Sequence, residues 1–259
     1  FFLDAAPNMG WFGYAPLTDL GGPAHEAGVR EVTHHLWQRY SASHNVHFIS
    51  VPFEGVVGEI LKTIPDGLMG VVFKRMMVRA ASRIAERAGI PALVTGDAIA
   101  QVSSQTLANL ALIDAASPMP ILRPLLTEDK QAIIDQARQI DTARHAEVMP
   151  EYCGVISKRP HVKADPAKVA EAETDFDFSV LDAAIEQAVT TRSNRLMERP
   201  APVTDDALLI IDSPASLDNV DAPCVIDIRA PQEREEAPLQ LDRVPQLQIP
   251  FYELQERAP

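Results

Sequence analysis

Short apolar runs typical of β-strands alternate with amphipathic helical segments from residue 21 onward, and this alternation constrains the possible fold most strongly. The runs are rich in β-branched and aromatic residues, which favour strands. Strands that alternate with helices pair in parallel, so the pattern predicts a layered α/β domain. The predicted strands are VHFISVPF (46–53), PALVTGD (91–97) and ILRPL (121–125).

Helix signals separate these strands. Gly89 is a good stop for the longest predicted helix, and Thr127 is the predicted N-cap of the last one. Ligands bind such sheets at the carboxyl ends of the strands, where the stretches TGD (95–97) and RPL (123–125) fall. The predicted helices are 21–43, 54–64, 67–89, 101–113 and 128–140.

Charge and cysteine content exclude several classes of protein. The 259 residues carry a formal net charge of −13, so any RNA contact must rest on a local basic patch or on residues outside this chain. Two cysteines do not make the disulfide framework of a small secreted domain. No apolar run reaches the ~18 residues of a membrane span, and the N-terminus lacks the basic region of a signal peptide. We therefore predict a cytoplasmic protein with no membrane association.

A proline-rich, charged stretch divides the chain. ERPAPVTDD (198–206) is interpreted as a linker between a domain at 20–197 and a second module at 207–259. The second module is short for an independent α/β domain. Its strand-like runs are ALLIID (207–212), CVIDIR (224–229) and QLQIPF (246–251).

Two features of the first domain could bind an anion. In TGDAIAQVSSQT (95–106) a strand runs through a glycine into a polar helix start, whose free N–H groups and hydroxyls suit a phosphate or an adenylate. The alternative is a plain turn with Ser and Thr caps, since no glycine-rich fingerprint is present. Lys130 lies in a first helical turn, where the helix dipole disfavours a cation. Either an anionic ligand lies near it, or Glu128 or Asp129 pairs with it.

The predicted helix at 67–89 carries arginines at a spacing of four, which places them along one face. This row could meet a phosphate backbone, or it could be a solvated face with Glu86 nearby. Lys74 is offset from the row, so it could point toward the strand ends while the arginines point outward. The row consists of Arg75, Arg79, Arg83 and Arg87.

The cysteines and histidines form no complete catalytic or metal-binding pattern by themselves. Cys153 lies in the polar stretch PEYCGVISK (150–158), where the charges of Lys158 and Arg159 would favour a thiolate if they fold back near it. An inert packed thiol is the alternative. Cys224 begins a buried-type strand and is interpreted as structural. The histidines show no HExxH or Cys/His zinc spacing, so we assign no metal.

Four long stretches between Leu20 and Leu181 carry a resemblance to a known family. They are LGGPAHEAGVREV, FKRMMVRAASRIAERAGIPALVTGDAIAQVSSQTLANL, ILRPLLTEDKQAII and MPEYCGVISKRPHVKA. These stretches resemble the tRNA 4-thiouridine synthases, the tRNA uracil sulfurtransferases that also serve thiamine thiazole synthesis. In the second module, VIDIRAPQE and IPFYEL resemble the start of the rhodanese-like domain that some members carry.

The resemblance implies a PP-loop ATP pyrophosphatase fold of the adenine-nucleotide α-hydrolase type, which is a Rossmann-like parallel sheet with helices on both faces. It implies that ATP, with Mg²⁺, activates the C4 oxygen of a tRNA uridine by adenylation, and that a persulfide sulfur then displaces AMP. A cysteine desulfurase is the implied persulfide donor. The sulfur carrier protein of thiamine thiazole synthesis is an implied second acceptor.

The resemblance also implies roles for five residues. Lys74, Gly96 and Gln105 match positions that contact ATP in the family. Lys130 matches a lysine needed for activation, where it would neutralise the polyphosphate as charge develops. Cys153 matches the resolving cysteine, which attacks the persulfide-bearing cysteine of the rhodanese domain and closes a disulfide as sulfur leaves.

The chain departs from the family pattern in several places. Residues 1–19 look foreign, because APNMGWFGYAPLTD stands where an SGGxDS-type PP-loop is expected just upstream of Leu20. The chain starts at Phe1, lacks the ferredoxin-like and THUMP regions, and stops before the rhodanese active-site cysteine, a position that Cys224 does not occupy. We therefore expect an incomplete copy of the enzyme. The alternatives are a truncated or chimaeric product without catalysis, and another PP-loop ATP-dependent ligase, in which PEYCGVISK would have no place.

Overall fold

The structure, a computed structural model, divides the chain into two units, Phe1–Glu198 and Arg199–Pro259. In the second unit, β7 (Val225–Asp227) and β8 (Gln246–Gln248) pair in parallel, whereas the predicted strand at 207–212 lies outside the described residues. The structure describes residues 2–5, 8–12, 18–41, 46–146, 157, 159–198, 225–227, 234 and 245–248.

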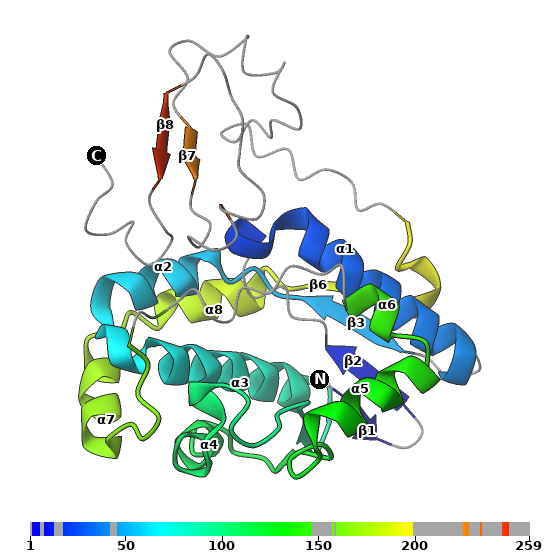
Figure 1. Ribbon diagram of the computed structural model, residues 1–259, viewed down its shortest axis with the longest axis horizontal. Helices are drawn as coiled ribbons and strands as arrows, with labels where there is room; N and C mark the ends of the chain where they lie inside the picture. The colour runs from blue at the N-terminus through cyan, green and yellow to red at the C-terminus, as the bar shows by residue number, and fades with distance from the viewer. Residues whose placement is uncertain are drawn as a thin grey trace. The chain divides into compact units, whose positions relative to one another are not determined.

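A six-stranded sheet with the order β5-β4-β1-β2-β3-β6 lies in the first unit (Figure 1). The pairs β2–β3 and β4–β5 are parallel, and the pairs β1–β2, β1–β4 and β3–β6 are antiparallel. The predicted α/β class is confirmed, and β1, β2 and β6, which the sequence patterns did not predict, add antiparallel pairs to the sheet. The strands are β1 Phe2–Ala5, β2 Asn8–Phe12, β3 His47–Ser50, β4 Leu93–Val94, β5 Ile121–Leu122 and β6 Val189–Arg192.

In Figure 1, α1 lies above β3 and β6, whereas α2, α3 and α8 lie to the left of the labelled strands. The α-helices are α1 Thr18–Leu36, α2 Glu54–Thr63, α3 Met69–Arg87, α4 Leu107–Asp114, α5 Lys130–Gln139, α6 Ala143–Ala146, α7 Pro166–Thr174 and α8 Ser179–Glu186. A π-helical turn, η1 Trp37–Ser41, follows α1, and the 3₁₀ turns are η2 Asp66–Leu68, η3 Ser103–Gln105 and η4 Ser193–Arg195.

The ends of two helices test the predicted stop and cap residues. Gly89 has a φ of 68° and follows the end of α3, as a C-terminal glycine stop should. Thr127 is not the cap of α5, because the carboxylate of Asp129 accepts the N–H of Gln131 at 2.8 Å and the helix begins at Lys130. A turn in which Glu128 donates its N–H to the carbonyl of Leu125 delays the helix start.

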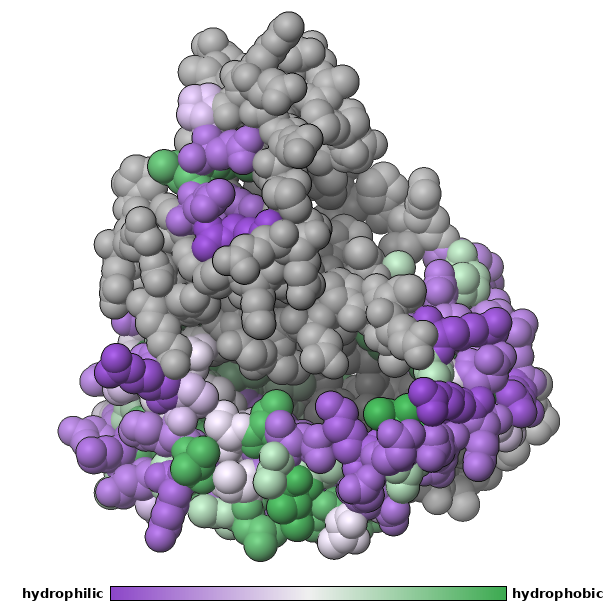
Figure 2. Space-filling model, in the orientation of Figure 1, coloured by the Kyte–Doolittle hydropathy of each residue, from purple (hydrophilic) through white to green (hydrophobic). Residues whose placement is uncertain are grey.

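The core of the first unit forms where α2, α3 and α8 pack together beside the sheet. Phe53 and Phe73 meet edge to face there, with ring centroids 6.2 Å apart. On the face in Figure 2, apolar surface gathers around α4, between hydrophilic surfaces along α7 and α5. Among the described residues, no helix combines the length and apolarity that crossing a bilayer requires. The largest fully buried side chains include Phe48, Phe53, Ile60, Met76, Leu93, Ile113, Leu181 and Leu196.

The arginine row of α3 forms ion pairs with acidic residues of α7 and α8. Neither interpretation of the row predicted these ion pairs, in which all four arginines have carboxylate partners. Two of them share the partly buried carboxylate of Glu173, which fastens α7 to α3. The pairs are Arg75–Glu173 at 2.6 Å, Arg79–Glu173 at 2.7 Å, Arg83–Asp182 at 2.5 Å and Arg87–Glu186 at 2.6 Å.

Candidate functional site

The carboxylate of Asp97, just beyond the end of β4, gathers four side chains. Two of them, Lys74 and Gln105, are residues for which the sequence predicts a cofactor role, so the structure brings these two together. The other two, Thr95 and Arg123, were not predicted as site residues, although they lie in the stretches TGD and RPL that the sequence places at strand ends. The contacts to Asp97 are Lys74 Nζ at 2.7 Å and Gln105 Nε2 at 3.2 Å on Oδ1, and Thr95 Oγ1 at 2.7 Å and Arg123 Nε at 3.3 Å on Oδ2.

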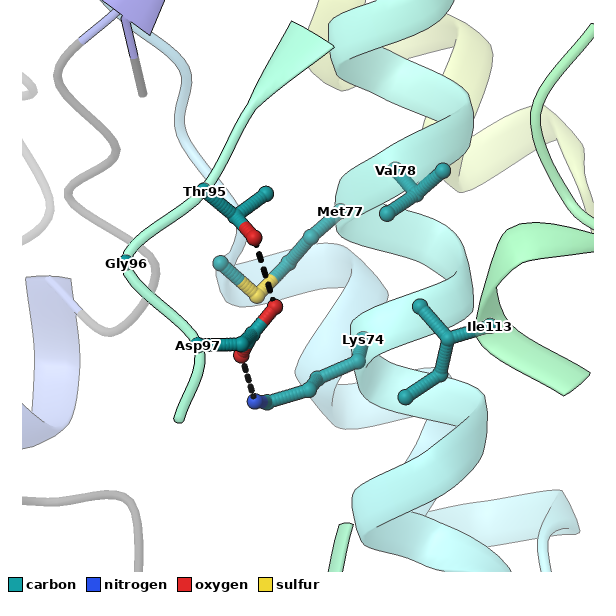
Figure 3. Close-up of a pocket in the computed structure, with 7 residues that line it drawn as sticks. All are labelled: Lys74, Met77, Val78, Thr95, Gly96, Asp97 and Ile113. Carbon is teal, nitrogen blue, oxygen red and sulfur yellow. Dashed lines mark hydrogen bonds and ion pairs between the residues drawn. The ribbon is translucent and has the colours of Figure 1, made fainter. Parts of the chain in front are cut away.

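Neighbouring elements account for this convergence. Lys74 lies in the second turn of α3 and points toward the end of β4, away from the arginine row, as its offset position indicates (Figure 3). Arg123 directly follows β5, whose parallel pairing with β4 places the two carboxyl ends side by side. Its guanidinium also binds Asp114 at 2.6 and 3.1 Å, so it bridges two carboxylates.

The electrostatics of the cluster keep Asp97 ionised. Burial raises the pKa of this carboxyl group, but the charge of Lys74 and the hydrogen bonds from Lys74, Thr95 and Gln105 outweigh it and hold the pKa at about 2. The negative charge in turn holds the ammonium of Lys74 and the guanidinium of Arg123 in place. Two cations are thereby positioned at the ends of adjacent strands before any ligand binds.

A pocket of about 150 Å³ lies beside this cluster. A side chain at Gly96 would meet no atom within 4 Å, so neither packing nor a left-handed φ requires glycine at this position among the described residues. A glycine here leaves the backbone open to a ligand. The pocket is lined by Lys74, Met77, Val78, Thr95, Gly96, Asp97 and Ile113 (Figure 3).

Gln105 carries a buried acceptor that no described residue satisfies. Its Oε1 atom has no hydrogen-bond partner within the described part of the chain, while its amide nitrogen donates to Asp97. An unsatisfied buried acceptor costs about 1–3 kcal/mol. A ligand that presents an N–H group to Oε1 would recover this energy.

Of the two residues with predicted catalytic roles, only Lys130 is described, and it is not among the side chains that contact Asp97. Lys130 is exposed at the start of α5 and has no ion-pair or hydrogen-bond partner among the described residues, so neither Glu128 nor Asp129 neutralises it there. Cys153 lies outside the described residues, as does Cys224. The roles of Lys130 and Cys153 therefore stay predictions.

Comparisons with known proteins place the chain in a family. The family model described as "Thiamine biosynthesis protein (ThiI)" matches residues 16–178. The tRNA sulfurtransferases of Yersinia pestis (strain Pestoides F) and Yersinia pseudotuberculosis serotype O:1b (strain IP 31758) are both 53% identical over 236 residues, which are 91% of this chain and 48% of each relative. The chain thus spans about half the length of the curated relatives it matches.

A solved structure shares the fold. It is the crystal structure of a 4-thiouridine synthetase–RNA complex with bound ATP, with a TM-score of 0.62 and 27% identity. The match covers 71% of this chain and 47% of the solved one. With the family model covering the α/β unit from α1 to the residue before α8, the chain belongs to the thiamine biosynthesis protein (ThiI) family.

Proposed function

We propose that this chain carries the ATP site of an enzyme that transfers persulfide sulfur to a tRNA uridine and so forms 4-thiouridine. The observation that carries the proposal is the cluster at Asp97, where Lys74 and Gln105 converge beside the open backbone of Gly96. Family membership supports it, and so does the likeness to an enzyme whose crystal structure holds ATP and RNA.

The residues at the site fit an adenine nucleotide. The Oε1 atom of Gln105, which has no donor among the described residues, suits the amino group of adenine, and the ammonium of Lys74 suits a phosphate. Gly96 leaves backbone groups open to the same ligand. When bound, ATP with Mg²⁺ would supply the adenylation that makes the uridine C4 oxygen a leaving group. Lys130 is proposed to neutralise charge that develops on the phosphates.

Sulfur transfer requires a second set of groups. The terminal sulfur of a persulfide, loaded by a cysteine desulfurase, would attack C4 as AMP leaves, so that a disulfide bond joins the persulfide-bearing cysteine to the C4 sulfur. The Cys153 thiolate would then attack the cysteine sulfur of that bond. The bond to the C4 sulfur breaks, 4-thiouridine leaves with the electron pair, and the two cysteines remain as a disulfide. External thiol would restore both. A sulfur carrier protein of thiamine thiazole synthesis is the proposed second acceptor, and the cytoplasm is the proposed location.

A chimaera tests this function. Residues 20–197 would replace the matching segment of the tRNA sulfurtransferase of Yersinia pestis (strain Pestoides F), in a strain without that enzyme. We expect 4-thiouridine in the tRNA, measured by mass spectrometry of digested nucleosides. Lys74→Ala should lower its formation about 100-fold, whereas Lys168→Ala, which removes an exposed lysine of α7, should not. A chimaera that accumulates normally but forms no 4-thiouridine would contradict the proposal.

The same chimaera tests Cys153. Cys153→Ser should release no 4-thiouridine without added thiol, because no second thiolate can free the sulfur from the persulfide-bearing cysteine. The unaltered chimaera should release about one 4-thiouridine per enzyme before its disulfide must be reduced. Purified protein, unmodified tRNA and a stoichiometric count of 4-thiouridine give the measurement. If this variant releases as much 4-thiouridine as the unaltered chimaera under the same non-reducing conditions, Cys153 is removed from the mechanism.

A further inference from the structure

The segment that follows Cys153 is fastened at two points. Ser157 is four residues after Cys153, so their Cα atoms are at most about 14 Å apart. Ser157 and residues 159–164, here called the 157–164 segment, precede α7 and contain no helix or strand among the described positions. Their hydrogen bonds run to the turn at Asp66–Gly67 and to the start of α4.

The first fastening is the turn at Asp66–Gly67. His161 donates its N–H to the carbonyl of Gly67 at 2.9 Å. Two more bonds join Asp66 to the segment, from Ser157 Oγ to the Asp66 carbonyl at 2.8 Å and from the N–H of Arg159 to its carboxylate at 2.9 Å. The His161 ring lies so close that a Cβ on Gly67 would be 2.5 Å from its Nε2. An alanine at this position would therefore displace the His161 ring.

The second fastening is Asn109 in α4, whose side chain is fully buried. Its amide nitrogen donates to the carbonyls of Ser103 and His161, both at 2.8 Å. Its amide oxygen accepts the N–H of Ala164 at 2.9 Å. The hydroxyl of Thr106 adds a bond to the carbonyl of Val162 at 2.6 Å. One buried amide thus joins α4, η3 and the 157–164 segment.

The 3₁₀ turn η3 links the side-chain amide of Asn109 to the candidate site. Ser103 and Gln105 both lie in η3, and Gln105 donates to Asp97. We propose that Asn109 and Gly67 are positioning residues, which hold the 157–164 segment against the turn that presents Gln105. The chain that leads back to Cys153 then starts from a fixed point beside the nucleotide site. This inference rests on the proposed function, because that function gives Cys153 its role.

The reactivity of the Cys153 thiol tests the proposal in the full 259-residue chain. Rates of alkylation by iodoacetamide would be measured across pH, with peptide mass spectrometry to separate Cys153 from Cys224. Gly67→Ala displaces His161, and Asn109→Asp keeps the bond from Ala164 while it removes both amide donors. Each should change the rate–pH profile of Cys153 by at least about threefold at its most affected pH and leave that of Cys224 unchanged.

Gly70→Ala is the matched control, because a Cβ at Gly70 meets no atom within 4 Å. It should leave the Cys153 profile as in the unaltered chain. A merely structural fastening would lower the thermal midpoint of Gly67→Ala and Asn109→Asp while both Cys153 profiles stay within about 1.5-fold of the unaltered one, and this result would overturn the proposal. If Asn109→Asp does not fold, Gly67→Ala decides alone.

Failure of the proposed function has a different signature. Normal release of 4-thiouridine by the Cys153→Ser chimaera without added thiol would deny the thiol its redox role, yet the alkylation profiles would still show whether Gly67 and Asn109 set its surroundings. Changed alkylation profiles of Cys153, together with normal 4-thiouridine formation by the Cys153→Ser chimaera, would mean that Gly67 and Asn109 hold the segment for another purpose. This result would overturn the positioning role proposed here.

Discussion

At the scale of single residues, Asp97 is the unusual member of the site. It places a negative charge where an anionic ligand is proposed to bind, yet it also anchors Lys74 and Arg123. Without the carboxylate, two largely buried cations would lose their shared partner. Asp97 therefore repels an anionic ligand to some extent, but it also holds Lys74 and Arg123 in position before that ligand binds.

Replacement of Asp97 by asparagine should destabilise the chain. Its carboxyl pKa falls from 3.8 to about 2 in the folded state, which corresponds to about 2 kcal/mol of stabilisation at neutral pH. Urea unfolding at pH 7 should show a loss of this size for Asp97→Asn. Asp135→Asn, which breaks an exposed pair with Arg138 on α5, should cost at most about 0.5 kcal/mol. Equal losses for the two variants would refute the anchoring role.

Sequence patterns predicted some of these residues and missed others for a physical reason. The direction of Lys74 follows from its place on one helix, because side-chain direction in a helix depends on local spacing. Asp97 was not singled out, since its partners Lys74 and Arg123 lie 23 and 26 residues away and only the sheet brings them together. The Oε1 atom of Gln105 lacks a donor among the described residues because of how the chain packs, which local sequence does not show.

At the scale of elements, the arginine row of α3 could also be predicted only in part from the sequence. A spacing of four predicts a shared face, but the face of α3 meets acids 94 to 99 residues later in the chain. Nothing local identifies them. The cap of α5 is a subtler case: Thr127 and Asp129 are both good cap residues, and the turn from Leu125 to Glu128 selects the second.

Glu173 should make the packing of α7 on α3 sensitive to acid. Burial raises its pKa, but hydrogen bonds and charge from Arg79 and Arg75 lower it from 4.5 to about 2. Since the folded pKa is the lower one, this stabilisation of about 3 kcal/mol is present above pH 4.5 and disappears as the pH falls toward 2. Urea unfolding at several pH values should show that stability declines in this window.

The variant Glu173→Gln isolates this effect. It should be less stable than the unaltered chain at pH 7 and should decline less between pH 4.5 and pH 2, because one titrating group is gone. Glu186→Gln is the control, since its pair with Arg87 is exposed on both sides and contributes at most about 1 kcal/mol. Parallel stability–pH curves for Glu173→Gln and the unaltered chain would show that Glu173 is not the acid-sensitive group.

At the scale of the whole molecule, the chain has the side-chain cluster at Asp97 but a different sequence where the phosphate-binding loop is expected. The cluster at Asp97 is complete among the described residues, whereas APNMGWFGYAPLTD stands where the family resemblance predicts the phosphate-binding PP-loop. Binding of the base and binding of the polyphosphate should therefore be separable in this chain.

Calorimetry should show this separation. The 259-residue chain is expected to bind ATP with a dissociation constant weaker than about 100 µM, because the serine–glycine cradle is missing. The chimaera, which has the stretch of the Yersinia pestis relative upstream of residue 20, should bind at least about tenfold more tightly, a difference of 1.4 kcal/mol. Micromolar affinity of the 259-residue chain would show that the cradle is dispensable.

The two outer strands of the sheet have a consequence for self-association. β5 has only two residues and is followed by Arg123 and by Pro124, whose nitrogen cannot donate a hydrogen bond. β6, at the other edge of the described sheet, reads VTTR and ends on a charge. Short, proline-ended and charged margins are poor templates for strands from another copy. The sheet should therefore resist edge-to-edge polymerisation at high protein concentration.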